Sequence, residues 1–134
     1  MAKKKILLAE DDKDDQMLFQ EFLKNKSDIS IMPMAENGEV LLAQLEGIND
    51  NNDLPSLIIL DQNMPRKGGL QTLQALKADK RFSHIPVVIY STYTDDRLVQ
   101  AGLEAGACVV LAKPLTKEDY SNMLEEMIRT CVQV

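Results

Sequence analysis

The chain has 134 residues, of which 45% are hydrophobic and 27% charged, and its formal net charge at pH 7 is −6. This length suits one domain with its own core, and the hydrophobic content argues against disorder. The acidic balance argues against general affinity for nucleic acid or an anionic membrane surface. No apolar run reaches the length of a signal-peptide core or a membrane span. We therefore expect a cytoplasmic protein with one domain over residues 1–134 and no output domain.

Strand and helix patterns alternate along the whole chain. In chain order they predict a strand at 6–9, a helix at 13–25, a strand at 29–32, a helix at 38–46, a strand at 57–60, a helix at 69–79, a strand at 87–90, a helix at 95–105, a strand at 109–112, and a helix that Thr116 caps and whose apolar residues run from Tyr120 to Cys131. Five such repeats predict right-handed crossovers and a three-layer α/β/α sandwich around a parallel sheet.

The predicted strands differ in how they should be buried. The runs at 6–9, 57–60, 87–90 and 109–112 are apolar and rich in β-branched residues, which is typical of strands covered on both faces. The run at 29–32 alternates and precedes Pro33, so we expect a half-exposed strand near the sheet edge.

Each of the four apolar runs ends on a polar residue. The first is followed by Glu10 and Asp11, and Asp61 follows the run at 57–60. Carboxyl ends of parallel strands meet at one rim, where ligands of open α/β sheets bind. Clustered acids repel one another and raise at least one pKa unless a cation joins them, and Mg²⁺ prefers oxygen ligands. This rim is therefore predicted to hold a divalent metal and a phosphoryl group.

The other two runs end on a hydroxyl pair and a lysine. Ser91 and Thr92 could donate to a phosphoryl oxygen or cap the following helix, and Lys113 could bridge Asp61 to a phosphoryl group or lie on the surface. Asp61 itself could be a nucleophile, a metal ligand or a helix-capping acid.

Several further residues are expected to have structural roles only. Asp14 and Asp15 are interpreted as a solvated helix start, and His84 as a turn residue on the opposite rim. Cys108 and Cys131 form no metal or redox motif, so we expect buried, reduced thiols.

Four motifs together resemble the receiver domains of two-component response regulators, the CheY-like family, in their single-domain form. The motifs are Leu8–Asp12, Leu60–Pro65, Ile89–Thr92 and Ala112–Pro114, and the likeness covers essentially the whole chain. It implies a doubly wound, flavodoxin-like (βα)₅ fold with strand order 2-1-3-4-5.

The resemblance implies a role for each acid at the rim. Asp61 corresponds to the phosphoacceptor, which takes a phosphoryl group from a histidine kinase, a histidine phosphotransfer protein or a small donor. Asp11 and Asp61 correspond to direct Mg²⁺ ligands, Glu10 acts through water, and Asn63 lends its backbone carbonyl. No other cofactor is implied.

Lys113 then corresponds to the phosphate-contacting lysine, with a cis peptide bond to Pro114, and Ser91 to the switch hydroxyl. Two positions depart from the family pattern. Val110 stands where the family usually has Tyr or Phe, so Tyr93 or Tyr90 would have to substitute if any aromatic does. Thr92 stands where Ala or Gly is common, and we expect it to slow the access of small donors and water.

The resemblance implies a signalling domain that catalyses only its own phosphorylation and dephosphorylation. Its output would be an unidentified protein target, without direct contact to nucleic acid or membrane; a homodimer through the fourth helix, fifth strand and fifth helix is left open. Two alternatives remain. A haloacid-dehalogenase-like Mg²⁺-dependent phosphohydrolase would want Asp-x-Asp after its first strand, and a flavodoxin-like electron carrier would want a hydroxyl-rich loop where this chain has acids.

Overall fold

A computed structural model describes residues 4–24 and 26–132. The strands are β1 (Lys4–Ala9), β2 (Ile29–Ile31), β3 (Leu57–Asp61), β4 (Val87–Ser91) and β5 (Val109–Ala112). They form one parallel sheet in the order β2-β1-β3-β4-β5. The α-helices are α1 (Lys13–Lys24), α2 (Gly38–Glu46), α3 (Gly69–Ala78), α4 (Asp96–Glu104) and α5 (Lys117–Cys131), and a short 3₁₀ helix, η1, spans Asn51–Asp53. The three-layer α/β fold is the one that the alternating pattern predicts, and the doubly wound strand order is the one that the resemblance to receiver domains implies.

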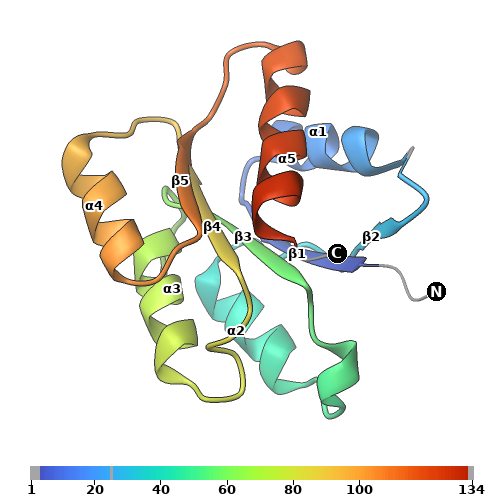
Figure 1. The fold of residues 1–134 in the computed structure, drawn as a ribbon, viewed down its shortest axis with the longest axis vertical. Coiled ribbons are helices and arrows are strands. Elements are labelled where there is room, and N and C mark those ends of the chain that lie inside the picture. Colours follow the sequence, from blue (N-terminus) through green and yellow to red (C-terminus); the bar gives the residue numbers. More distant parts are fainter. Residues whose placement is uncertain (1–3, 25, 133–134) are drawn as a thin grey trace.

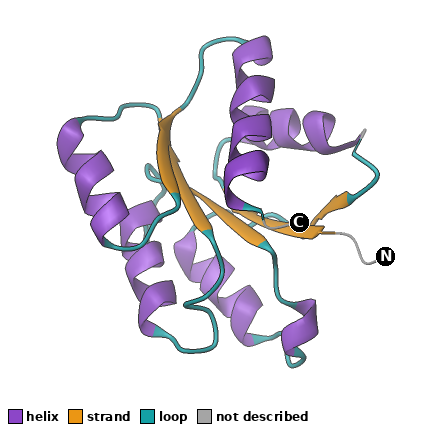
Figure 2. Ribbon diagram, in the orientation of Figure 1, coloured by secondary structure: helices purple, strands orange, loops and turns teal. Residues whose placement is uncertain are grey.

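The sheet separates two layers of helices. Figure 1 shows α1 and α5 against one face, while α2, α3 and α4 cover the other, and Figure 2 shows the strands running between them. Alternate residues of β1, β3 and β4 supply the two cores, so that Ile6 and Leu8 pack with Phe19 and Met127, whereas Leu7 packs with Leu41. Burial on both sides explains why these strands read as continuous apolar runs.

The predicted element boundaries are close to the observed ones. Strands β3 and β4 each extend one residue further, to Asp61 and Ser91, and the strand expected at 29–32 ends at Ile31. The predicted end of the first helix, at residue 25, lies outside the described residues. Thr116 caps α5 as expected, since its hydroxyl accepts a hydrogen bond from the Asp119 amide at 3.1 Å.

The expected burial of residues 109–112 is wrong. All four residues of β5 are half-buried or exposed, because β5 is an edge strand that pairs only with β4. The expected cis peptide bond before Pro114 is also wrong, since every peptide bond in the described part of the chain is trans.

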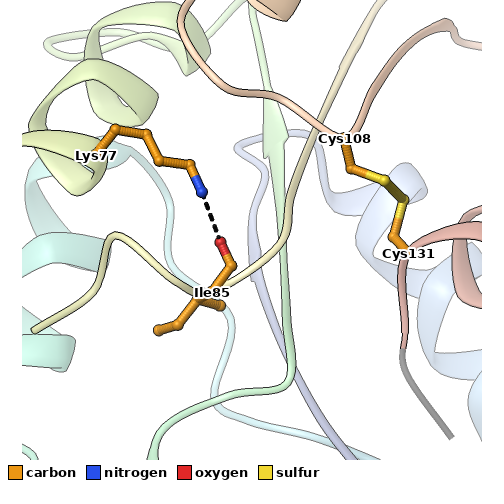
Figure 3. The surroundings of a disulfide bond; sticks show 4 residues. All are labelled: Lys77, Ile85, Cys108 and Cys131. Carbon is orange, nitrogen blue, oxygen red and sulfur yellow. Dashed lines mark hydrogen bonds between the residues drawn. A yellow bond between two sulfur atoms is a disulfide. The ribbon is translucent and has the colours of Figure 1, made fainter.

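The two cysteines form a disulfide, which corrects the expectation of reduced thiols. Cys108 precedes β5 and Cys131 ends α5, and their Cα atoms are 6.2 Å apart. Figure 3 shows the bond joining these two segments, with the Lys77 ammonium hydrogen-bonded to the Ile85 carbonyl at 3.0 Å before β4. The two cysteines are 23 residues apart in the sequence, and their spacing gives no sign that they pair. They meet because α5 returns along the sheet to the start of β5.

No helix in the described residues is long and apolar enough to cross a membrane.

Reduction of this disulfide should destabilise the protein. A bridge that closes a loop of 23 residues is expected to contribute about 3 kcal/mol, chiefly by restricting the unfolded chain. Urea unfolding with and without a phosphine reductant measures the loss. The Cys108→Ser, Cys131→Ser double variant is the control and should not respond to reductant. A wild-type protein whose stability is unchanged by reductant would contradict the expectation.

Candidate functional site

The register of the sheet brings the predicted polar residues to one rim. Ala9, the last residue of β1, pairs with Leu60, so Glu10 follows beside Asp61. Asp61 pairs with Tyr90, and Ser91 pairs with Ala112, immediately before Lys113. The Lys113 amide also donates to the Ser91 carbonyl at 2.8 Å, which extends the pairing past the end of β5.

Three carboxylates cluster at this rim. Oxygens of Glu10, Asp11 and Asp61 all lie within 4.8 Å of one another. Glu10 and Asp61 are buried, with 0% and 1% of their surface exposed, while Asp11 faces solvent. Neither buried acid caps a helix: Asp61 accepts the Asn63 amide at 3.0 Å in the loop before α3. The donor set consists of oxygens and reaches solvent at Asp11, which fits a hard divalent cation that keeps several waters.

Lys113 lies among the acids rather than on the surface. Its ammonium nitrogen is 2.9 Å from Glu10, 2.9 Å from Asp15 and 3.2 Å from Asp61, and only 12% of its side chain is exposed. Burial alone would lower the pKa of Lys113, but its hydrogen bonds to Asp15 and Glu10 and the attraction of Asp61 outweigh burial and raise it. The lysine is therefore a permanent cation at the centre of the site.

Asp15 is a site residue that sequence reasoning missed. Asp14 is exposed at the helix start, as expected, but Asp15 is half-buried and pairs with Lys113. The Asp12 side chain accepts the Asp14 and Asp15 amides at 2.8 and 3.3 Å and so begins α1 at this point. With the start of the helix known, Asp15 falls on the side of the first turn that faces the rim.

Tyr90 is the second residue that sequence reasoning left without a firm role. It is fully buried, and its hydroxyl donates a hydrogen bond to Glu10 Oε1. Burial is the main cause that raises the pKa of Glu10, to about 8, and its hydrogen bond with Asp61 adds to the effect. One acid of the cluster thus has a raised pKa, as predicted, although burial rather than charge repulsion is the larger cause.

The two hydroxyl residues at the end of β4, Ser91 and Thr92, differ in burial. Ser91 is buried, and its Oγ lies 2.7 Å from Asn63 Oδ1 and 2.8 Å from the Tyr93 carbonyl. Thr92 is exposed. Neither residue caps α4, because Asp95 fills that position and accepts the Leu98 amide at 2.8 Å.

The remaining predicted positions lie around or away from this rim. Tyr93 is 75% exposed, and His84 precedes β4 at the opposite rim. Val110 is half-buried and packs against Gly102 of α4, where an added Cβ would lie 2.6 Å from a Val110 methyl group.

The profile of the response regulator receiver domain matches residues 6–125, which carry all of these groups. The chain belongs to the response regulator receiver family. It is 33% identical over 124 residues to the response regulator Rcp1 of Synechocystis, covering 91% of this chain and 84% of Rcp1. It is also 34% identical over 131 residues to the histidine kinase P4 of Formosa agariphila, but covers only 9% of that protein's length.

Solved receiver structures share the whole fold. The Mn²⁺-bound form of Rcp1 superposes with a TM-score of 0.84 at 30% identity, over 98% of this chain and 96% of that one. The phosphorylated cyanobacterial phytochrome response regulator RcpA superposes with a TM-score of 0.86 at 27% identity, over 97% and 94%. The protein is a receiver domain of two-component phosphorelay signalling, a signalling domain, and the comparisons give the phosphohydrolase alternative no support.

The raised pKa of Glu10 predicts a dependence of stability on pH. Between its ordinary value of 4.5 and about 8, the folded protein keeps a proton that the unfolded chain has released. The free energy of unfolding of the metal-free protein should therefore fall as the pH rises through this window. Urea unfolding in a chelator across the window measures the fall. Glu10→Gln should lose less stability than wild type, and equal losses would contradict the assignment to Glu10.

Proposed function

We propose that Asp61 is the phosphoacceptor of this receiver domain. The observation that carries the proposal is the ammonium of Lys113 placed 3.2 Å from Asp61 Oδ2, inside a group of acids that would otherwise repel an incoming phosphate. An Asp61 oxygen attacks the phosphorus of a phosphohistidine. The phosphorus–nitrogen bond breaks, and its electron pair stays on the imidazole nitrogen, which then takes up a proton from solvent.

The acids beside Asp61 are proposed to hold Mg²⁺. Asp11 and Asp61 would bind it directly, Glu10 through water, and Asn63 through its backbone carbonyl. The Mn²⁺-bound form of Rcp1 and the cluster of oxygens within 4.8 Å support a divalent cation here. When bound, the ion supplies positive charge against the negative charge that develops on the phosphoryl oxygens.

Lys113 and Ser91 are proposed to contact the phosphoryl group. Lys113 already reaches Asp61, so a phosphoryl oxygen on that carboxylate lies within reach of the same ammonium. Ser91 has one hydroxyl proton and two acceptors near it, the Asn63 side chain and the Tyr93 carbonyl. A phosphoryl oxygen would compete for that proton, so its arrival would release the loop between β4 and α4.

Thr92 and Tyr93 are exposed and follow the switch hydroxyl of Ser91 in the chain. We propose that their side chains restrict access to the phosphorylation site. Their side chains stand on the loop that follows Ser91. Access of water and of small phosphodonors would be slower than in receivers with Ala or Gly after the switch hydroxyl, and the phosphoryl lifetime would change accordingly.

The proposed partners follow from phosphoryl transfer. A sensor histidine kinase or a histidine phosphotransfer protein in the cytoplasm would supply the phosphoryl group, and the likeness to RcpA favours a phytochrome-like sensor. The signal would pass to a protein target, with the face of α4, β5 and α5 as the candidate surface for that target or for a second copy.

Phosphorylation by acetyl phosphate tests the assignment of Asp61. With Mg²⁺, the intact mass should rise by one phosphoryl group that is stable to acid and labile to alkali, as an acyl phosphate is. Asp61→Asn should abolish the gain. Asp14→Asn is the control, because Asp14 is an exposed acid in the first turn of α1 and should remain dispensable.

Two results would contradict the proposal. One is a phosphoryl gain that survives in Asp61→Asn. The other is a wild-type protein that responds neither to acetyl phosphate nor to beryllofluoride with Mg²⁺ present. Turnover of a generic phosphoester would instead favour a hydrolase.

A further inference from the structure

The Tyr90 hydroxyl lies directly against the acidic rim, yet the proposed transfer chemistry makes no use of it. Tyr90 is the fourth residue of β4, has 0% of its surface exposed, and pairs in the ladder with Asp61. Its hydroxyl donates to Glu10 Oε1. Removal of this hydroxyl would leave the buried Glu10 side chain with one hydrogen-bond donor fewer.

Glu10 is held from three sides. Oε1 accepts from Tyr90 and lies 2.9 Å from the Lys113 ammonium, while Oε2 accepts the Asp12 amide at 3.0 Å. Lys113 can leave Oε1, because it also has Asp15 and Asp61 as partners. The bond from Tyr90 would still hold Oε1 if the lysine moved to those partners, together with the hydrogen bond between Glu10 and Asp61.

Tyr90 itself is firmly fixed. Its ring packs edge-on against Phe19, with centroids 5.8 Å apart and planes at 82°, and Phe19 packs in the same way against Tyr120 at 5.5 Å. The Lys113 ammonium lies 4.9 Å from the centroid of the Tyr90 ring. A ring so enclosed by α1, α5 and the sheet cannot act as an aromatic that swings between surface and interior.

We propose that Tyr90 is a positioning residue for the divalent cation, whose hydroxyl holds the Glu10 carboxylate in the orientation that metal binding requires. The inference rests on the proposed function, in which Glu10 contacts the metal through water. Hydrogen bonds to metal-binding carboxylates from outside the ligand set are general devices of metal sites, and their loss typically weakens binding by about 10–100-fold.

Tyr90→Phe is the test, because it keeps the ring and removes only the hydroxyl. Binding of Mn²⁺, followed through the electron paramagnetic resonance signal of the free ion, and of Mg²⁺, followed by calorimetry, gives the dissociation constants. Tyr90→Phe should raise both by about tenfold or more. Tyr120→Phe is the matched control: its hydroxyl is 3.5 Å from that of Tyr90 and does not contact Glu10, so its effect should stay below about twofold.

A double-mutant cycle separates positioning from general packing. In Glu10→Asp the carboxylate is one methylene shorter and withdraws from Tyr90, so adding Tyr90→Phe there should change the metal affinity little.

The outcomes are distinguishable. Wild-type and Tyr90→Phe proteins with equal affinities would overturn the inference. So would a Tyr90→Phe effect that is the same in the wild-type protein and in the Glu10→Asp variant, or an equal loss in Tyr120→Phe. A wild-type protein that binds neither ion would refute the proposed metal site itself, and the inference with it.

Discussion

The ammonium of Lys113 is the charge on which the rim of this sheet depends. It lies within 3.2 Å of carboxylates from three different segments: Glu10 after β1, Asp15 in α1 and Asp61 at the end of β3. Two of these acids are almost wholly buried, and buried charges are tolerated only when they are paired. One cation therefore permits several acids to gather where a metal and a phosphoryl group can be received.

The same contacts set the balance between resting and phosphorylated states. Without a metal, two positive charges offset the negative charge of the clustered acids: the ammonium of Lys113, and the proton that Glu10 retains because its pKa is raised. A divalent cation would replace that proton, and a phosphoryl group on Asp61 would give the lysine a new acceptor. Charge interactions thus determine which state of the site is favoured. Its rigid parts, β3, β4 and the Tyr90 ring, hold the reacting groups in place.

Much of this arrangement could be predicted from the sequence, because a parallel sheet imposes it. Apolar runs that end on Glu10, Asp61, Ser91 and Lys113 must place these residues at one rim, whatever the details of packing. Asp15 could not be recognised, since its role depends on where α1 begins and how the helix turns. The role of Tyr90 could not be predicted either, because its hydrogen bond to Glu10 depends on how deeply the side chain lies in the core, which the spacing of residues does not reveal.

The other misjudged features depend on long-range placement. The disulfide joins residues whose proximity follows from α5 lying alongside β5, and the exposure of β5 follows from its place at the edge of the sheet. Val110 packs directly on Gly102 of α4, so the position where related receivers carry an aromatic is occupied here by a small side chain in close contact with a helix.

The central claim is that the carboxyl-end rim receives a metal and a phosphoryl group. It is tested most directly by amide NMR spectra, recorded first with added Mg²⁺ and then with beryllofluoride. The account predicts that shifts concentrate at the carboxyl-end rim, in Glu10 to Asp12, Asp61 to Asn63, Ser91 to Tyr93 and Lys113. His84 and Ile85, at the opposite rim, should stay unchanged. Shifts that centre on another surface, or spectra that do not respond to either addition, would contradict it.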